Sequence, residues 1–262
     1  MHDGGHYQGI RNQLINPKAA IGQLNSWLFL RPHGLTISVE IDRKGLFMAV
    51  SLPNGAKLSL AVTYGAIIAI TAASNAAPAV LSAAAHGLAN GDLVEVTSSW
   101  GKLSNRIYRV STSATGTFAL EGTDTTDVKA FPVGRANITV RKIATQEQIL
   151  QVLTSTSSGG DMGFTDVGFL EEGSTFQLPT QAAAQSIALS IGDDPTLAGY
   201  KALKAAADAR AIRALICELP TGSLIFYNAY VSLNETPTLT SNEVMAVTAT
   251  FSLRAPPVRY SA

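Results

Sequence analysis

The sequence predicts a mainly β protein with one flanking helix and a small inserted β-domain. The last third of the chain follows the order strand, short helix and three further strands. Residues 73–137 contain several short apolar runs separated by turn signals, and we interpret them as the inserted domain. A content of 46% hydrophobic and 15% charged residues is typical of a folded chain with a sizeable core.

The first strand and the helix are predicted from their side-chain spacing. Residues 186–191 alternate, so Ile187, Leu189 and Ile191 share one face. Asp194 and Pro195 then predict a helix start, as the N-cap and the first helical residue. Spacings of three and four place four side chains on one helix face. These are Leu197, Tyr200, Leu203 and Ala207.

Three strands are predicted after the helix, over residues 212–219, 224–233 and 244–253. In the last strand, apolar side chains alternate with small polar ones. The apolar set is Met245, Val247, Ala249, Phe251 and Leu253. Long strands with few charges are aggregation hazards in a monomer, so we expect neighbouring copies to cover their edges.

The same region contains no group equipped for catalysis, which points to a function carried by a surface. Cys217 is the only cysteine, which excludes an intramolecular disulfide and a multi-cysteine metal site. Its place in a predicted strand indicates a buried apolar side chain. The formal net charge of zero gives no electrostatic footprint for tight nucleic-acid binding.

Residues 58–73 are apolar but shorter than the roughly 20 residues that a membrane-spanning helix needs. They are rich in β-branched residues, and we expect buried strands with a turn or bulge near Gly65.

Residues 1–47 differ from the rest because they show no useful periodicity. Arg43-Lys44-Gly45 precedes Met48, and its codons can form a purine-rich ribosome-binding sequence. We therefore hypothesise that translation begins at Met48 and that residues 1–47 are a non-native or disordered extension. The alternative is a genuine arm that reaches a neighbouring subunit.

Two C-terminal stretches carry a resemblance to a known family. Gly222 to Val231 contains Phe-Tyr-Asn-Ala-Tyr-Val, and Glu243 to Leu253 is a Thr-rich closing strand. Both resemble the last strands of the major tail tube proteins of long-tailed bacteriophages. The likeness covers about Met48 to Ile70 and Ile138 to Pro257, and it implies a tail tube domain over residues 48–72 and 138–262.

The resemblance implies a tail-tube-like β-sandwich or barrel and a structural virion protein. The subunit would form stacked hexameric rings that conduct DNA, with no catalytic, cofactor or metal site. Its implied partners are copies of itself, the tape measure, tail terminator and distal tail proteins, and genomic DNA that passes without specific binding. It would be made in the host cytoplasm and located in the phage tail, with no membrane partner.

The predicted insert carries a more specific motif. Its residues are His86, Gly87, Asn90, Gly91, Asp92 and Tyr108. The pattern resembles a small β-barrel module of phage tail proteins, which would decorate the outside of the tube. Asn90-Gly91 is a strong tight-turn signal. We interpret His86 as a turn histidine bonded to the backbone, because no activated nucleophile accompanies it. Trp100 and Tyr108 are expected to pack in a small core and not to form a sugar platform.

Residues 154–168 are rich in Ser, Gly and Thr, and we expect a long irregular loop. A loop at this place resembles the element with which tail tube proteins touch the adjoining ring. The implied contact residues are Asp161, Phe164, Asp166, Phe169, Glu171 and Glu172. The apolar ones would dock while the acids set the register, and the segment would be mobile in the free subunit. The alternative is a solvated surface loop.

Three other functions stay open at this point. One is the tube of a related bacteriocin or secretion apparatus. Another is a carbohydrate-binding or adhesive β-protein that uses the insert. A third, a hydrolase built around His86, would need activity that is lost in His86→Ala.

Overall fold

A computed structural model describes residues 54–134, 137–171 and 173–262. The predicted extension over residues 1–47 lies outside the described residues, as does Met48, the hypothesised start.

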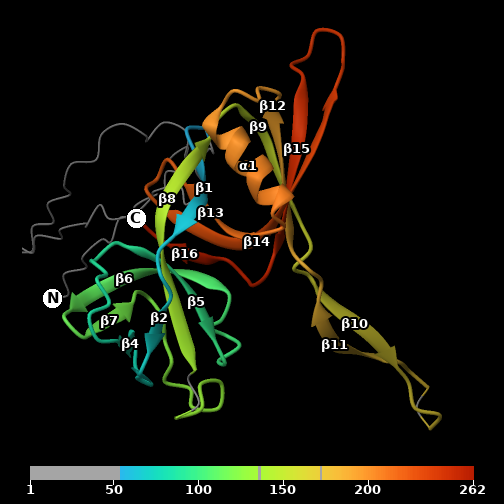
Figure 1. The fold of residues 1–262 in the computed structure, drawn as a ribbon. Coiled ribbons are helices and arrows are strands. Elements are labelled where there is room, and N and C mark those ends of the chain that lie inside the picture. The colour runs from blue at the N-terminus through green and yellow to red at the C-terminus, as the bar shows by residue number, and fades with distance from the viewer. Residues whose placement is uncertain (1–53, 135–136, 172) are drawn as a thin grey trace, which may run out of the picture. The chain divides into compact units, whose positions relative to one another are not determined.

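The described chain is mainly β, with sixteen strands and one helix, and this confirms the predicted class (Figure 1). The helix is α1 (Ala198–Asp208). The strands are β1 (Lys57–Tyr64), β2 (Ile68–Ile70), β3 (Ala72–Ala73), β4 (Ala79–Ser82), β5 (Leu93–Ser98), β6 (Arg106–Ala114), β7 (Thr117–Leu120), β8 (Ile138–Ile149), β9 (Val152–Ser158), β10 (Met162–Val167), β11 (Phe176–Ala182), β12 (Ser186–Gly192), β13 (Ile212–Glu218), β14 (Leu224–Thr238), β15 (Ala246–Leu253) and β16 (Val258–Tyr260).

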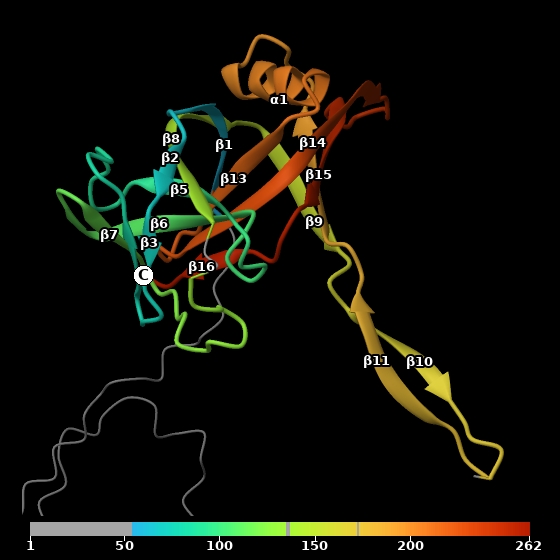
Figure 2. The ribbon, with the colours of Figure 1, turned by 60° about the horizontal axis from the view of Figure 1, so that its bottom comes forward.

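Fourteen strands form one curled sheet, and β10 and β11 form a separate pair (Figure 2). The main path runs β3-β4-β7-β6-β5-β8-β1-β13-β14-β15-β12-β9, with β2 on β8 and β16 on β14. The strands of the predicted insert therefore occupy one end of the path, and β12 and β9 occupy the other. The long strand β8 joins the two halves because it pairs with both β5 and β1.

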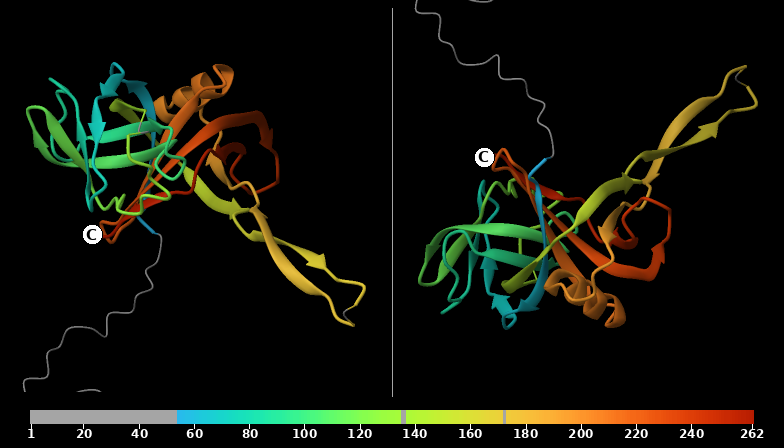
Figure 3. Two further views of the ribbon diagram at one scale, coloured as in Figure 1. Left: turned by 90° about the horizontal axis from the view of Figure 1, so that it is seen from below. Right: turned by 90° about the horizontal axis from the view of Figure 1, so that it is seen from above.

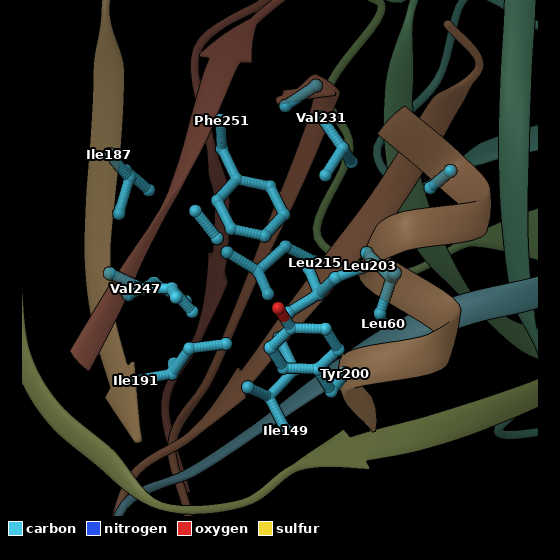
Figure 4. Close-up of a cluster of buried hydrophobic side chains, with 14 residues drawn as sticks. Leu60, Ile149, Ile187, Ile191, Tyr200, Leu203, Leu215, Val231, Val247 and Phe251 are labelled. Carbon is cyan, nitrogen blue, oxygen red and sulfur yellow. The ribbon is translucent and has the colours of Figure 1, made fainter. Parts of the chain in front are cut away.

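One core lies between α1 and the sheet (Figure 4). Tyr200 and Leu203 from the helix pack with apolar side chains of β12, β15 and neighbouring strands, including Ile191, Val247 and Phe251. This confirms the alternation in the first and last predicted strands and the helix face of Leu197, Tyr200 and Leu203. Met245 is an exception, because it precedes β15 and is exposed. The prediction for Ala207 is wrong, because Ala206 is the alanine that packs into the core.

The predicted helix start is wrong by three residues. Helix α1 begins at Ala198, with Leu197 as the N-cap and no side-chain capping bond. Asp194 instead accepts hydrogen bonds from the amide and hydroxyl of Thr196, at 3.0 and 2.6 Å. This local turn satisfies the aspartate before the helix begins, since short polar side chains compete with helical geometry.

A second core belongs to the β3–β8 side of the sheet. Its fully buried side chains include Leu81, Leu103, Phe118 and Leu120. Trp100 and Tyr108 are also buried here, with ring faces inside the core. The irregularity expected near Gly65 is a bulge and not a turn, because β1 and β2 both pair antiparallel with β8 and the register slips between them. The Gly65 amide continues this pairing and donates to the Lys142 carbonyl at 2.8 Å.

A buried polar junction connects the two sides. The Glu95 carboxylate is 5% exposed, pairs with the Arg141 guanidinium and accepts a bond from Asn228 Nδ2 at 2.9 Å. The Arg141 guanidinium lies 4.2 Å from the centre of the Tyr64 ring. Burial raises the pKa of Tyr64 to about 12, so this ring stays neutral beside the charges.

The predicted irregular loop over residues 154–168 is wrong. The structure has strand β9 there, then a hairpin of β10 and β11. Burial is the usual signal that marks a strand, and β9 and β11 are almost wholly exposed. A Ser- and Gly-rich sequence without an apolar face therefore resembled a loop.

Candidate assembly surface

A projecting hairpin is the most distinctive surface of the described chain, and we define it as the arm, residues 159–184. It consists of β10 and β11, and neither strand pairs with the large sheet. All four views show it extending away from the sheet, on the opposite side from β6 and β7 (Figures 1, 2 and 3).

Both faces of the arm are partly apolar. Cross-strand partners share a face, so Phe164 lies with Pro179, while Val167 and Phe176 lie on the other face beside Leu178. Phe164 is 59% exposed, and every residue of β11 is exposed. An isolated two-stranded hairpin is only marginally stable in water. The arm therefore presents apolar surface that its own chain leaves uncovered.

The base of the arm is set by two glycines. Gly159 and Gly160 have φ values of +76° and +88°, a backbone region that favours glycine. A Cβ at Gly159 would lie 1.9 Å from the Ala184 carbonyl oxygen. Hydrogen bonds between Gly160 and Ala183, and between Ala183 and Asp161, close the base at 3.1 and 2.9 Å. The departure of the arm from β9 and β12 is thus fixed by backbone contacts.

The sequence-predicted contact residues fall on this arm and its tip, which we define as residues 168–175. Asp161, Phe164 and Asp166 lie on β10 or at the base, and all are exposed. At the tip, Phe169 packs against Phe176 with ring centroids 5.8 Å apart. Glu171 is exposed, whereas Glu172 lies outside the described residues. Asp166 accepts a bond from Gln177 at 3.0 Å, so its carboxylate is bound across the hairpin.

A second exposed apolar group lies at the opposite ends of the same strands. The Gly192 amide bonds to Gln151 and the Asp193 amide bonds to Met245, which brings these strand ends together. We define the end patch by its exposed apolar members. They are Leu150, Leu153, Leu239, Val244 and Met245. The end patch could not be predicted from the sequence, because its members are scattered over three segments.

The His86 side chain is bonded to the backbone and packed in the core. The Leu88 amide donates to Nδ1 at 3.1 Å, which leaves Nε2 to donate to the Ala114 carbonyl at 2.7 Å. The ring packs against Phe118 with centroids 5.0 Å apart. Both ring nitrogens are therefore used by the backbone, which leaves neither to act as a base toward a substrate.

The rest of the insert motif surrounds this histidine. Gly87 and Gly91 adopt positive φ, and Asn90 accepts a bond from the Ser113 amide at 2.7 Å. Asp92 accepts from the Ala89 amide and pairs with Lys142 at 2.7 Å. Partial burial opposes ionisation of Asp92, but these two partners prevail and lower its pKa. Together these contacts hold the turn against β6 and β8.

Tyr108 and Trp100 are core residues at 4% and 2% exposure. Burial raises the pKa of Tyr108 to about 12. Trp100 donates to the Pro132 carbonyl at 3.1 Å and packs edge-on against Phe131. Both rings belong to the buried core, as expected from the sequence.

Within the described ranges, no three His, Cys, Asp or Glu side chains come together as a metal site. Cys217 is half-buried in β13, and burial raises the pKa of its thiol. No helix among the described residues is long and apolar enough to cross a membrane.

The described chain is thus a β-protein with an exposed arm, an exposed apolar end patch and a histidine bonded to the backbone. The comparisons give the family: the chain belongs to the phage tail tube proteins, because the family described as "Phage tail tube protein, TTP" matches residues 98–262. The match begins at the end of β5 and thus includes part of the predicted insert.

One similar solved structure is described as the anti-feeding prophage cap, a tube-terminating cap. The match has 21% sequence identity and a TM-score of 0.29, and it covers 41% of this chain and 79% of the cap chain. No curated protein matches the sequence. Family membership makes this chain a structural tail tube component of the virion, and the family is not one of enzymes.

Proposed function

We propose that the chain is a tail tube subunit that forms hexameric rings, and that these rings stack into a tube whose lumen conducts genomic DNA. The observation that carries the proposal is the arm, which extends apolar side chains on both faces beyond its own sheet. In a chain of the tail tube family, such an arm is suited to dock on a copy in the adjoining ring.

The open edge of the sheet supports lateral contacts. β9 ends the strand path, and its outer side pairs with no strand among the described residues. Its Ser- and Thr-rich residues are exposed and uncharged. An unpaired edge of this kind is a template for another chain, and a ring would cover it. Permanent interfaces commonly bury more than about 2,000 Å².

The repeating axial contact is heterologous in this proposal. The arm and the end patch lie at opposite ends of β9 and β12, so the two axial surfaces of a copy differ. A heterologous contact that does not close produces an open filament. Such a filament suits a tube.

The predicted insert comprises residues 73–137. Its strands have a separate core and lie across the sheet from β9. We place it on the outside of the tube as the small β-barrel module. The tape measure, tail terminator and distal tail proteins would contact the tube ends, and the absence of a net positive charge suits passage of DNA without tight binding.

Negative-stain electron microscopy tests the proposal directly. The full chain and a chain begun at Met48 should be imaged over a range of concentrations. Stacked rings or hollow tubes are expected, and six-fold averages of end views would establish the ring size. Uniform small particles at every concentration, from both chains, would overturn the proposal. Intact mass of the product from the native gene would decide between Met1 and Met48.

Hydrogen exchange tests the docking role of the arm. Protection across residues 154–172 should rise on assembly, because exposed hairpin amides become covered. The buried pair β6 and β7 serves as the internal control, with no change expected. Equal protection of residues 154–172 in the monomer and the tube would remove the docking role.

A further inference from the structure

The sheet face that points away from helix α1 consists of small uncharged side chains. Strands β14, β15, β12 and β9 are neighbours in one sheet, so alternate residues of each strand share a face. Ile191, Val247 and Phe251 point into the core beside α1 (Figure 4). The opposite face, which we define as the hydroxyl face, consists of the residues that alternate with this apolar set. They are Tyr230, Ser232 and Asn234 of β14, Thr248, Thr250 and Ser252 of β15, Ser186, Ala188 and Ser190 of β12, and Thr154, Thr156 and Ser158 of β9.

Strand pairing aligns these side chains in rows across the sheet. One row is formed by Ser158, Ser186, Ser252 and Tyr230, each paired with the next. The hydroxyls of Ser158 and Ser186 lie 2.8 Å apart and bond to each other. Thr156 of the next row donates its hydroxyl to the Ala188 carbonyl at 3.4 Å. The hydroxyl face is therefore one continuous polar surface across four strands.

Charged side chains lie on the other side of this sheet. Glu235 of β14 pairs with Lys204 of α1, and Lys201 is exposed on the same helix. The hydroxyl face contains no Asp, Glu, Lys or Arg. Arg254 follows β15 and lies 5.6 Å from the centre of the Tyr230 ring, at the end of the face. Soluble surfaces normally mix charges of both signs, so a four-strand face without any charge needs an explanation.

Both lateral edges of this four-stranded sheet are open. β9 ends the strand path on one side. On the other side, the pairing of β13 with β14 ends at Tyr230, so residues 231–238 of β14 have no strand beside them there among the described residues. Three antiparallel pairings separate β9 from β14, so these two strands run in opposite directions. Copies that all point the same way in a ring can therefore join β9 of one to β14 of the next as an antiparallel pair.

Charge decides which face of such a ring is suited to DNA. Proteins hold duplex DNA largely through cations that neutralise phosphates and release counterions. A ring with α1 inside would turn Lys201 and Lys204 toward the duplex. The hydroxyl face offers hydrated side chains and no fixed charge, so it has no electrostatic hold on phosphates.

We propose that the hydroxyl face forms the wall of the lumen, so that duplex DNA in transit meets neutral hydroxyls while α1 lies on the outside. This inference rests on the proposed tail tube and names the surface that faces the DNA. It is compatible with the axial contacts, because the arm and the end patch lie at the ends of the same strands and not on their faces.

Thiol labelling of assembled tubes is the first test. Thr248 and Thr156 are exposed in one copy, so Thr248→Cys and Thr156→Cys report on the hydroxyl face. Lys201→Cys on α1 is the matched control for the outside. Each variant carries Cys217→Ser, so that the introduced thiol is the only one. The reagents are N-ethylmaleimide and a polyethylene glycol maleimide too bulky to enter the tube.

All three thiols should react with both reagents in the free subunit. In tubes, the two hydroxyl-face thiols should react with N-ethylmaleimide and not with the bulky reagent, whereas the Lys201→Cys thiol should react with both. Hydroxyl-face thiols that react with both reagents would place the face outside. Thiols that react with neither would show that another chain covers the face. Either result would overturn this inference and leave the tube standing, whereas a wild-type chain that forms no ring or tube would overturn both.

An introduced cation tests the neutral wall. Tubes are assembled from the wild type with a minority of Thr248→Lys, and short duplex DNA is added during assembly. Nuclease then removes the DNA outside. At low salt the Thr248→Lys tubes should retain about tenfold more protected DNA than wild-type tubes, and the excess should disappear as salt rises.

Ala205→Lys is the matched control, because it adds the same charge at an exposed position on α1. DNA bound to these tubes should be digested. Equal amounts of protected DNA from the two lysine variants would overturn the assignment of the faces. Wild-type tubes that retain as much protected DNA as Thr248→Lys tubes would overturn the neutral wall.

Discussion

The hairpins β6–β7 and β10–β11 are both antiparallel strand pairs, but their environments are opposite. Each has one register shift. β6 and β7 bury Ile107, Val110 and Phe118, whereas β11 buries nothing. Both hairpins have hydrogen-bonded strand pairing. The difference between them is apolar burial, which stabilises β6–β7 within its own chain and is missing from the arm. The arm needs a partner for the stabilisation that β6–β7 obtains from the core.

Of the variants considered, Phe118→Ala should cause the largest loss of stability. The side chain is fully buried, so its loss should lower the free energy of unfolding by about 3–5 kcal/mol. Phe164→Ala on the arm should change that free energy by less than about 0.5 kcal/mol and still weaken assembly. Urea unfolding of both variants, with sedimentation of Phe164→Ala, measures the two effects. Equal losses of stability would mean that the arm packs on its own chain.

Glu95→Ala should disrupt the junction between the two sides of the sheet. It leaves Arg141 and Asn228 without their buried acceptor, and we expect a loss of about 3 kcal/mol in the free energy of unfolding. Glu171→Ala provides the matched control on the arm, with no measurable change expected. A loss below 1 kcal/mol, on the scale of surface pairs, would show that water replaces the carboxylate.

Gly159→Ala should affect the arm and leave the body intact. A Cβ there meets the Ala184 carbonyl at 1.9 Å and the residue has positive φ, so the arm base should be destabilised by about 1–2 kcal/mol. Gly173→Ala is the control, because a Cβ there meets nothing within 4 Å. Assembly and limited proteolysis at the arm should change only for Gly159→Ala. Normal tubes from both variants would show that the base geometry is unimportant.

Glu121→Gln should give the smallest effect. The Arg109 guanidinium holds the pKa of Glu121 below its ordinary value of 4.5, and both side chains are partly exposed. A lowered folded-state pKa stabilises the fold above pH 4.5, and this contribution is lost as the pH falls through the folded-state pKa. The variant should therefore be less stable by under about 1 kcal/mol at pH 7.

The stability of Glu121→Gln should converge with that of the wild type in acid. Urea unfolding at pH 7 and near pH 3 measures the difference. A difference that persists at the lower pH would assign the effect to packing and not to charge.

Local sequence patterns were sufficient to predict the elements whose side chains alternate between core and solvent. The strands at residues 186–192, 212–218 and 246–253, the apolar face of α1 and the mainly β class follow from local periodicity. The Thr-rich closing strand and its neighbour also gave the family resemblance that the match over residues 98–262 confirms.

The arm, the start of α1 and the end patch could not be predicted in this way, because they depend on contacts with residues outside the local pattern. Residues 159–184 form a hairpin whose strand β11 is fully exposed, so no apolar alternation in the sequence predicts it. Helix α1 begins after the predicted start because Asp194 bonds to Thr196 and does not cap the helix. The end patch assembles from segments that strand pairing brings together. Local sequence patterns record which side of a strand is apolar, but they do not record which strands become neighbours.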